Sequence, residues 1–133
     1  MNSNKSTKAL LVGVLLLSTA TFAKVKPADS RFVEQIQTAL KSDNPGVVES
    51  SIYVSLMAKN MFPEFNYNKV LNELSDLAAD GNSAVIKYKA QLAAIYFKYP
   101  ALFTDIEFKP TETPDKYFKM ISNKLVDNSL VSN

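Results

Sequence analysis

Four carboxylates fall within one short stretch near the C-terminal end of the chain: Asp105, Glu107, Glu112 and Asp115. Carboxylates held close together can transfer protons to and from a substrate, or bind calcium. Their spacing does not match a calcium-binding EF-hand loop, and two lysines lie among them. Asp115 also fits the acidic residue that is favourable in the first turn of a helix. We therefore expect neither an acid–base site nor a calcium site in this stretch.

Serine nucleophiles are present, but the chain has no base of the usual kind to activate them. Ser50, Ser51 and Ser55 lie close together, yet the sequence contains neither histidine nor cysteine. Their absence excludes histidine-based triads, cysteine nucleophiles and structural zinc sites. The chain has three glycines, too few for a glycine-rich phosphate loop. The sequence therefore predicts no enzyme, no cofactor and no metal; the alternative is an enzyme that uses carboxylates alone.

The first 23 residues have the pattern of a secretory signal peptide. Lys5 and Lys8 precede an apolar run from Ala9 to Leu17, and Thr21-Phe22-Ala23 fits a small-x-small cleavage site. We expect cleavage after Ala23 and export to the periplasm or the cell exterior. The alternative is an uncleaved anchor, for which the run is short, because a spanning helix needs about 20 residues.

Residues 24–133 are then expected to form a single helical domain. Without Lys5 and Lys8, the 15 basic residues become thirteen, which balance the 13 acidic residues. A net charge of zero gives no support for a nucleic-acid partner, which favours a basic surface. We likewise expect no stable membrane insertion after cleavage of the signal peptide.

Apolar residues at helical spacing predict a series of short helices and no sheet. Helices are expected from about Asp29 to Leu40, from Pro45 to Phe62 after a cap at Asn44, from about Val70 to Asp80 after a connection over Glu64–Asn68, from Asn82 or Ser83 to Lys98, and over 114–126, with a short turn at Pro100–Phe103. No segment shows a sustained alternation of apolar and polar residues, which a half-buried strand would require.

Two stretches of the chain repeat the same pattern at an interval of 37 residues. Val33, Leu40 and Asp43 in the first stretch correspond to Val70, Leu77 and Asp80 in the second, and Pro63 corresponds to Pro100. A period of this length is typical of stacked helical hairpins, in which each unit buries its apolar face on its neighbour.

The turn and second helix of each unit resemble HEAT repeats. The second unit has Asp80, Ile86-Lys87, Ala90 and Ala93-Ala94, and the first has Asp43, Val48-Glu49, Ile52 and Ser55-Leu56. Glu49 stands where the family usually has a basic residue, and Ile52 where it has a small one. The resemblance implies an all-α, short right-handed stack of about two hairpins, over 31–63 and 68–100, closed by a C-terminal capping helix over about 114–126. The alternative is an irregular helical bundle.

In a HEAT-like stack, the second helices would line an extended concave surface. The first helices of the two units correspond at an interval of 37 residues. The turn of the second unit is one residue longer, so the second helices correspond at an interval of 38 residues. Glu49 is therefore expected beside Lys87. The candidate binding face comprises Glu49, Tyr53, Asn60, Lys87, Gln91 and Lys98. Such surfaces often bind partners; the alternative is a solvated polar strip.

Aromatic residues gather in and after the fourth expected helix: Tyr88, Tyr96, Phe97, Tyr99, Phe103 and Phe108. They could form a groove for a peptide, glycan or lipid, or part of the core. We favour the core, because a helix that is apolar almost all round needs cover on several sides.

These observations together predict an exported helical-repeat protein that acts as a binding or scaffold module in the cell envelope. Its partner is expected to be another envelope protein. The alternatives are a self-associating structural protein, whose short stack pairs with a second copy, and the carboxylate-only enzyme.

Overall fold

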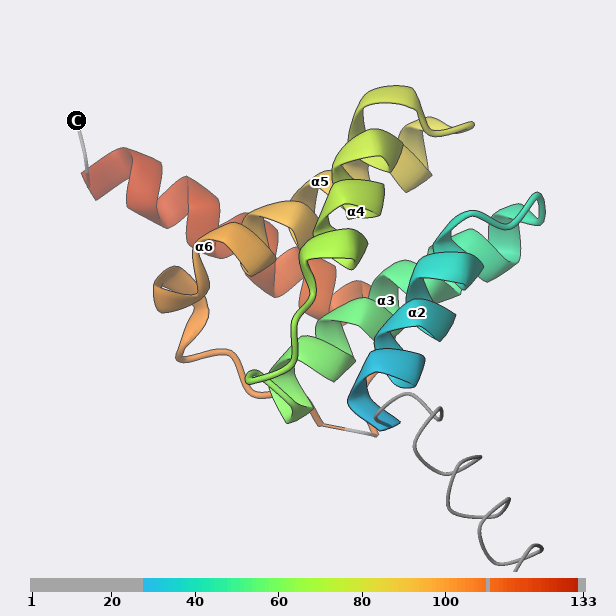
Figure 1. Cartoon of the computed structure of the whole chain (residues 1–133). Coiled ribbons are helices and arrows are strands. Elements are labelled where there is room, and N and C mark those ends of the chain that lie inside the picture. Colours follow the sequence, from blue (N-terminus) through green and yellow to red (C-terminus); the bar gives the residue numbers. More distant parts are fainter. Residues whose placement is uncertain (1–27, 110, 132–133) are drawn as a thin grey trace, which may run out of the picture.

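The computed structural model describes residues 28–109 and 111–131, and the regular structure within them is entirely helical. The helices are α2 (Ala28–Leu40), α3 (Pro45–Met61), α4 (Asn68–Asp80), α5 (Ala84–Lys98), the short 3-10 helix η1 (Pro100–Phe103) and α6 (Pro114–Val131). The all-α prediction is therefore confirmed (Figure 1). The predicted signal peptide lies outside the described residues.

The starts of α3 and α5 follow from side-chain caps. The Asn44 side-chain oxygen accepts hydrogen bonds from the backbone N–H groups of Gly46 at 2.9 Å and Val47 at 3.4 Å. At the start of α5, the Ser83 hydroxyl accepts from the Ile86 N–H at 3.1 Å. Each cap satisfies N–H groups that have no partner inside the helix. The predicted cap at Asn44 is confirmed, and Ser83 is the cap of α5.

A buried tyrosine fastens the end of α3 to the start of α4. The Tyr67 hydroxyl lies 2.8 Å from the Ala58 carbonyl oxygen and 2.9 Å from the Phe62 carbonyl oxygen, to which it donates. Burial, with a smaller contribution from Glu64, raises the pKa of Tyr67 to about 12. The hydroxyl therefore remains a donor, and it adds a side-chain hydrogen bond to carbonyl groups at the end of α3 that already accept from backbone N–H groups.

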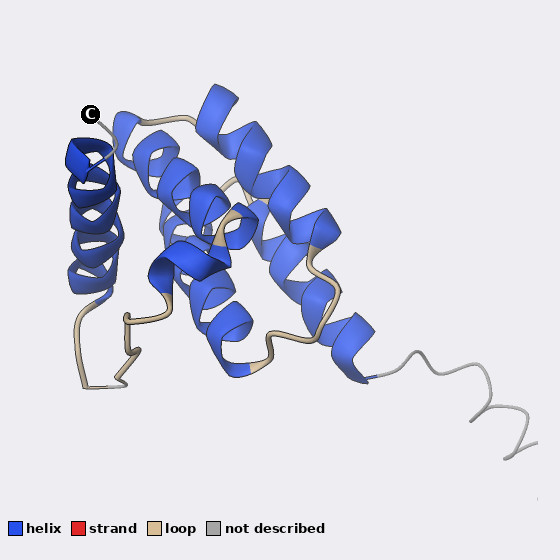
Figure 2. Cartoon of the chain, turned by 90° about the vertical axis from the view of Figure 1, so that its left-hand side faces the viewer, coloured by secondary structure: helices blue, strands red, loops and turns tan. Residues whose placement is uncertain are grey.

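The helices pack as two hairpins, one on the other. Helices α2 and α3 form the first hairpin and α4 and α5 the second; α2 packs on α4, and α3 packs on α5. Helix α6 packs on α5 and η1, as a third layer on the side away from α2 and α4 (Figures 1 and 2). The residues of α3 and α5 that correspond at an interval of 38 are buried in pairs: Val48 and Ile86, Ile52 and Ala90, Leu56 and Ala94.

The aromatic residues divide between the core and the surface. Tyr96, Phe97 and Phe103 are buried, which confirms the core interpretation for these three. Tyr88 and Tyr99 are instead more than half exposed, at 52% and 57%. The largest fully buried side chain is Tyr117 of α6, and the aliphatic residues around the centre of the core are Leu40, Ile52, Leu56, Val70, Leu74 and Ile121.

Helix α6 ends later than the sequence predicts. The capping helix was expected to end at about residue 126, but α6 continues to Val131. Beyond Leu125 the apolar side chains are exposed, so the buried stripe that marks a helix in a sequence stops there. No proline or glycine follows Leu125 to end the helix, so its backbone hydrogen bonds continue.

Candidate functional site

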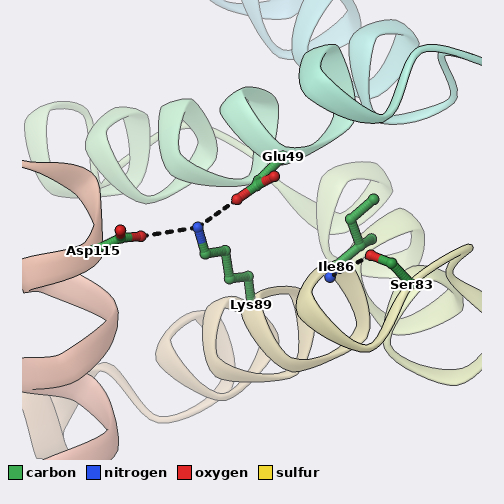
Figure 3. A network of polar contacts seen from close by, with 5 residues as sticks. All are labelled: Glu49, Ser83, Ile86, Lys89 and Asp115. Carbon is green, nitrogen blue, oxygen red and sulfur yellow. Dashed lines mark hydrogen bonds and ion pairs between the residues drawn. The ribbon is translucent and has the colours of Figure 1, made fainter.

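Lys89 of α5 joins three helices. Its ammonium lies 2.6 Å from a carboxylate oxygen of Glu49 on α3 and 3.0 Å from one of Asp115 on α6. The side chain of Lys89 is 14% exposed, whereas Asp115 is 82% exposed. Figure 3 shows the ammonium between the two carboxylates. One cation thus links α5 to α3 and to α6.

The surroundings keep Lys89 positively charged. Burial alone would lower its pKa, but hydrogen bonds and charge attraction from Glu49 and Asp115 outweigh it, so the pKa of Lys89 is raised. The ammonium also lies 5.2 Å from the centre of the Phe118 ring, a favourable cation–π contact. A nucleophilic lysine needs a lowered pKa. Lys89 therefore acts as a structural cation that holds α3 and α6 on α5.

A cleft of about 300 Å³ opens beside this ion-pair network. It lies between α3, α5 and the start of α6, and is lined by Gly46, Glu49, Ser50, Tyr53, Lys89, Pro114, Asp115 and Phe118. Tyr53 is stacked on Tyr117, with ring centres 5.9 Å apart. Burial and the neighbouring Tyr117 raise the pKa of Tyr53, so its hydroxyl stays protonated at neutral pH. The cleft thus combines aromatic walls with two partly exposed carboxylates.

The structure brings together only part of the predicted binding face. Glu49 and Tyr53 line the cleft, and Asn60 lies beside the hydroxyl of Tyr96. The ion-pair partner of Glu49 is Lys89, and not the predicted Lys87. Residues two apart on a helix point to nearly opposite sides, so the two lysines cannot both face α3. Lys87, Gln91 and Lys98 are exposed on α5.

The signal that could have identified Lys89 is its position outside the polar strip of α5. Lys87, Gln91 and Lys98 form that strip, whereas Lys89 stands among the apolar residues. A charged residue on an otherwise apolar face is rarely buried without a partner. Its two carboxylate partners lie 40 residues before it and 26 residues after it, and no local pattern identifies them.

The acids of the C-terminal loop serve as ion-pair partners. Asp105 lies 2.7 Å from the ammonium of Lys124, and Glu112 lies 2.6 Å from that of Lys116. Hydrogen bonds from these lysines lower the pKa of both carboxyl groups. Within residues 28–109 and 111–131, no three acidic side chains lie close enough together to hold a metal ion.

Tyr117 organises this loop from the core and was not identified from the sequence. Its buried ring is stacked between Tyr53 and Phe108, with 4.5 Å between the centres of the Phe108 and Tyr117 rings. Its hydroxyl accepts a hydrogen bond from the Lys109 N–H and donates one to the Lys109 carbonyl. The spacing of Tyr117, Ile121 and Leu125 at four-residue intervals could have placed it on the buried face of α6.

A second hollow, of about 340 Å³, lies between the turns of the two hairpins. Asp43 and Asp80, the acids that correspond in the 37-residue repeat, both line it, together with Glu73 and Asp76. Glu73 is already paired with Lys41 at 3.1 Å. This hollow marks where the turns of the two hairpins meet.

Beside the cleft, α3 carries an exposed apolar stripe. Val47, Val54 and Met61 stand seven residues apart and are 39%, 43% and 61% exposed. Ser50 and the half-buried Met57 lie between them on the same side of the helix. We refer to these five residues as the α3 stripe.

The positions on α5 that correspond to the α3 stripe differ in how far they are exposed. Val85 and Tyr99 are exposed, but Leu92, the counterpart of Val54, is only 5% exposed. Helix α6 reaches α5 at this level, where the Tyr88 hydroxyl lies 3.0 Å from that of Ser122. Leu92 is therefore buried on α5, one turn from the contact with α6, whereas Val54 is 43% exposed on α3.

Within the described part of the chain, no helix is both long enough and apolar enough to cross a lipid bilayer. Comparisons of the sequence and the structure with known protein families, curated proteins and solved structures give no match.

Proposed function

We propose that this chain is an exported, HEAT-like helical-repeat protein that binds a protein partner on the open face of α3. The repeat interpretation is supported by the stacking of one hairpin on the other, and by the three core pairs at an interval of 38 in which both residues are buried. In this proposal α6 closes the stack as a cap.

The observation that carries the proposal is the exposed α3 stripe. Aliphatic residues at seven-residue spacing normally face another helix, and Val54 and Met61 are 43% and 61% exposed, with no helix of residues 28–109 and 111–131 above them. Contiguous exposed apolar surfaces rimmed by polar residues mark interaction sites. An amphipathic segment is the natural ligand for such a surface, since α6 already packs on α5 in this way.

The cleft at the N-terminal end of α3 extends this surface. Glu49 and Tyr53, both from the candidate binding face, line it beside Ser50 of the α3 stripe. Lys89 holds this end of the surface in a fixed shape, because it ties α3 and α6 to α5. A rigid surface loses less conformational entropy when it binds a partner.

Export is proposed on the basis of the N-terminal sequence alone. In this proposal the mature protein begins at Lys24 and works in the periplasm or outside the cell. Mass spectrometry of the protein recovered after expression of the full sequence tests this point. A mass that still includes residues 1–23 would overturn the proposed cleavage.

Site-specific photo-crosslinking tests the binding proposal. A photoreactive amino acid at Val54 would report on contacts of the α3 stripe in living cells. The matched control is Gln35, an exposed residue of α2. We expect protein adducts from Val54 and few or none from Gln35. Equal adduct formation at the two positions, or none at either, would contradict a binding role for this face.

A further inference from the structure

The α3 stripe is nearly symmetric about its midpoint. Val47 lies seven residues before Val54 and Met61 seven residues after it, and Ser50 and Met57 lie between them. At 1.5 Å per residue the stripe is about 21 Å long. If two copies of α3 cross in opposite directions, Val54 meets Val54 and Val47 approaches Met61, so these three apolar residues find apolar partners, while Met57 approaches Ser50 of the other copy.

Charge also permits this self-pairing. In a two-fold interface a residue near the axis meets its own copy, so a charge there would face a like charge. Helix α3 has two charged residues, Glu49 and Lys59. Glu49 is held by Lys89, and the Lys59 ammonium lies 3.2 Å from the Pro63 carbonyl oxygen and over the Tyr67 ring. Both charges are therefore engaged away from the α3 stripe.

The geometry points to a second copy of this chain as a partner of the α3 stripe, in a two-fold dimer with Val54 at the axis. This inference rests on the proposed function, because it names a partner for the same open face. Covering the stripe removes Val47, Val54 and Met61 from water, as Leu92 is already removed from water at the corresponding position of α5. The contact is one helix wide, smaller than a standard interface of about 800 Å² per partner, so the dimer is weak and reversible.

Cysteine crosslinking tests this arrangement directly, because the natural chain contains no cysteine. The protein purified after export of the full sequence would carry Val54→Cys, Gln35→Cys or Val126→Cys. Val126 is an exposed apolar residue of α6 and controls for non-specific apolar contact. Under mild oxidation, Val54→Cys should form disulfide dimers faster than either control, on the order of tenfold, because pairing raises the effective concentration of the two thiols.

Light scattering of the unmodified protein provides a second readout. The mass should rise with concentration toward twice that of the monomer, whereas Val54→Lys should remain monomeric because like charges would meet at the axis. An equimolar mixture of Val54→Lys and Val54→Glu should regain the dimer, because opposite charges then meet. Circular dichroism checks that each variant keeps its helical content.

The outcomes separate this inference from the proposed function. If the three cysteine variants oxidise at the same slow rate and the protein stays monomeric at high concentration, self-pairing is overturned. Photo-crosslinks from Val54 to a different protein in cells would then leave the proposed function standing with another partner. If those crosslinks are also absent, the proposed function fails as well.

Discussion

At the scale of single residues, the polar side chains of this protein hold helices together. Lys89 links α5 to α3 and α6, Tyr67 links the end of α3 to the start of α4, and Tyr117 links α6 to the loop before it. Each of these three residues has a largely buried side chain and makes its contact through the polar group at the end of that side chain. Such groups are costly to leave without partners, so removing one affects every element that it joins.

Replacing Lys89 tests its role as a structural cation. Lys89→Met keeps most of the aliphatic volume but leaves Glu49 and Asp115 facing each other without the cation. Because both carboxylates are well exposed, we expect a loss of about 1 kcal/mol in the free energy of unfolding at neutral pH. Lys87→Met, which removes an exposed lysine two residues earlier, should change it by less than about 0.5 kcal/mol.

The effect of Lys89→Met should depend on pH in one direction. The pKa of Lys89 is higher in the folded protein than the 10.5 of a free lysine, so the stabilisation is fully present below that value. It is lost as the pH rises through the folded pKa. Denaturant unfolding at several pH values should therefore show a constant difference from the natural protein at neutral pH that disappears in strong alkali. A difference that grows with alkali would contradict this account.

Two tyrosine hydroxyls allow a matched comparison. Tyr117→Phe removes a buried hydroxyl and leaves the Lys109 N–H and carbonyl without it, so we expect a loss of about 1–3 kcal/mol in the free energy of unfolding. Tyr88→Phe makes the same chemical change at an exposed hydroxyl that contacts Ser122, and should cost less than about 0.5 kcal/mol. Denaturant titrations of both variants measure the difference. Equal losses would show that Tyr117 does not organise the loop.

At the scale of elements, the turn between α4 and α5 requires close approach of the backbone. Gly81 ends α4 with φ −58°, so its role is not to adopt a left-handed conformation. A Cβ at this position would lie 2.6 Å from the Leu77 carbonyl oxygen and 3.0 Å from a methyl carbon of Ile86. Both neighbours are fixed, one as helix backbone and the other as a buried side chain, so the turn has room only for glycine.

Alanine substitutions at two glycines test this explanation. Gly81→Ala should lower the free energy of unfolding by about 1–3 kcal/mol, the usual cost of overpacking. In Gly46→Ala the nearest atom to the new Cβ is the Asn44 side-chain oxygen at 3.3 Å, and the higher helix propensity of alanine offsets this contact. Thermal or denaturant unfolding should place Gly46→Ala close to the natural protein. If Gly81→Ala had the same free energy of unfolding as the natural protein, the explanation that a Cβ has no room at this position would be wrong.

The helices were predictable because their signals are local. Asn44 and Ser83 cap helices, Pro63 limits α3, and apolar residues recur at helical spacing, so most boundaries follow from a few neighbouring residues. The end of α6 was missed because its last turns bury little. The partner of Glu49 was missed because the 38-residue spacing aligns positions along α3 and α5, but does not determine which side of α5 faces α3. That choice depends on contacts between residues far apart in the sequence.

At the scale of the whole molecule, the chain is a short stack with one face unevenly covered. Leu92 on α5 is buried, while Val54, its counterpart on α3, is 43% exposed. Without cysteine the fold has no disulfide, so its stability comes from packing. The apolar side chains of the α3 stripe remain in contact with water, so they contribute less to that stability than buried side chains would. We interpret the stripe as a surface retained for binding.

Photo-crosslinking from Val54 in living cells, measured against Gln35, tests this claim most directly. The account predicts discrete protein adducts from Val54, including a dimer of the chain itself, and little crosslinking from Gln35 on the polar face of α2. If Val54 gives no more adduct than Gln35 while both variants fold and are exported, the α3 stripe is not a binding surface and the proposed function is wrong.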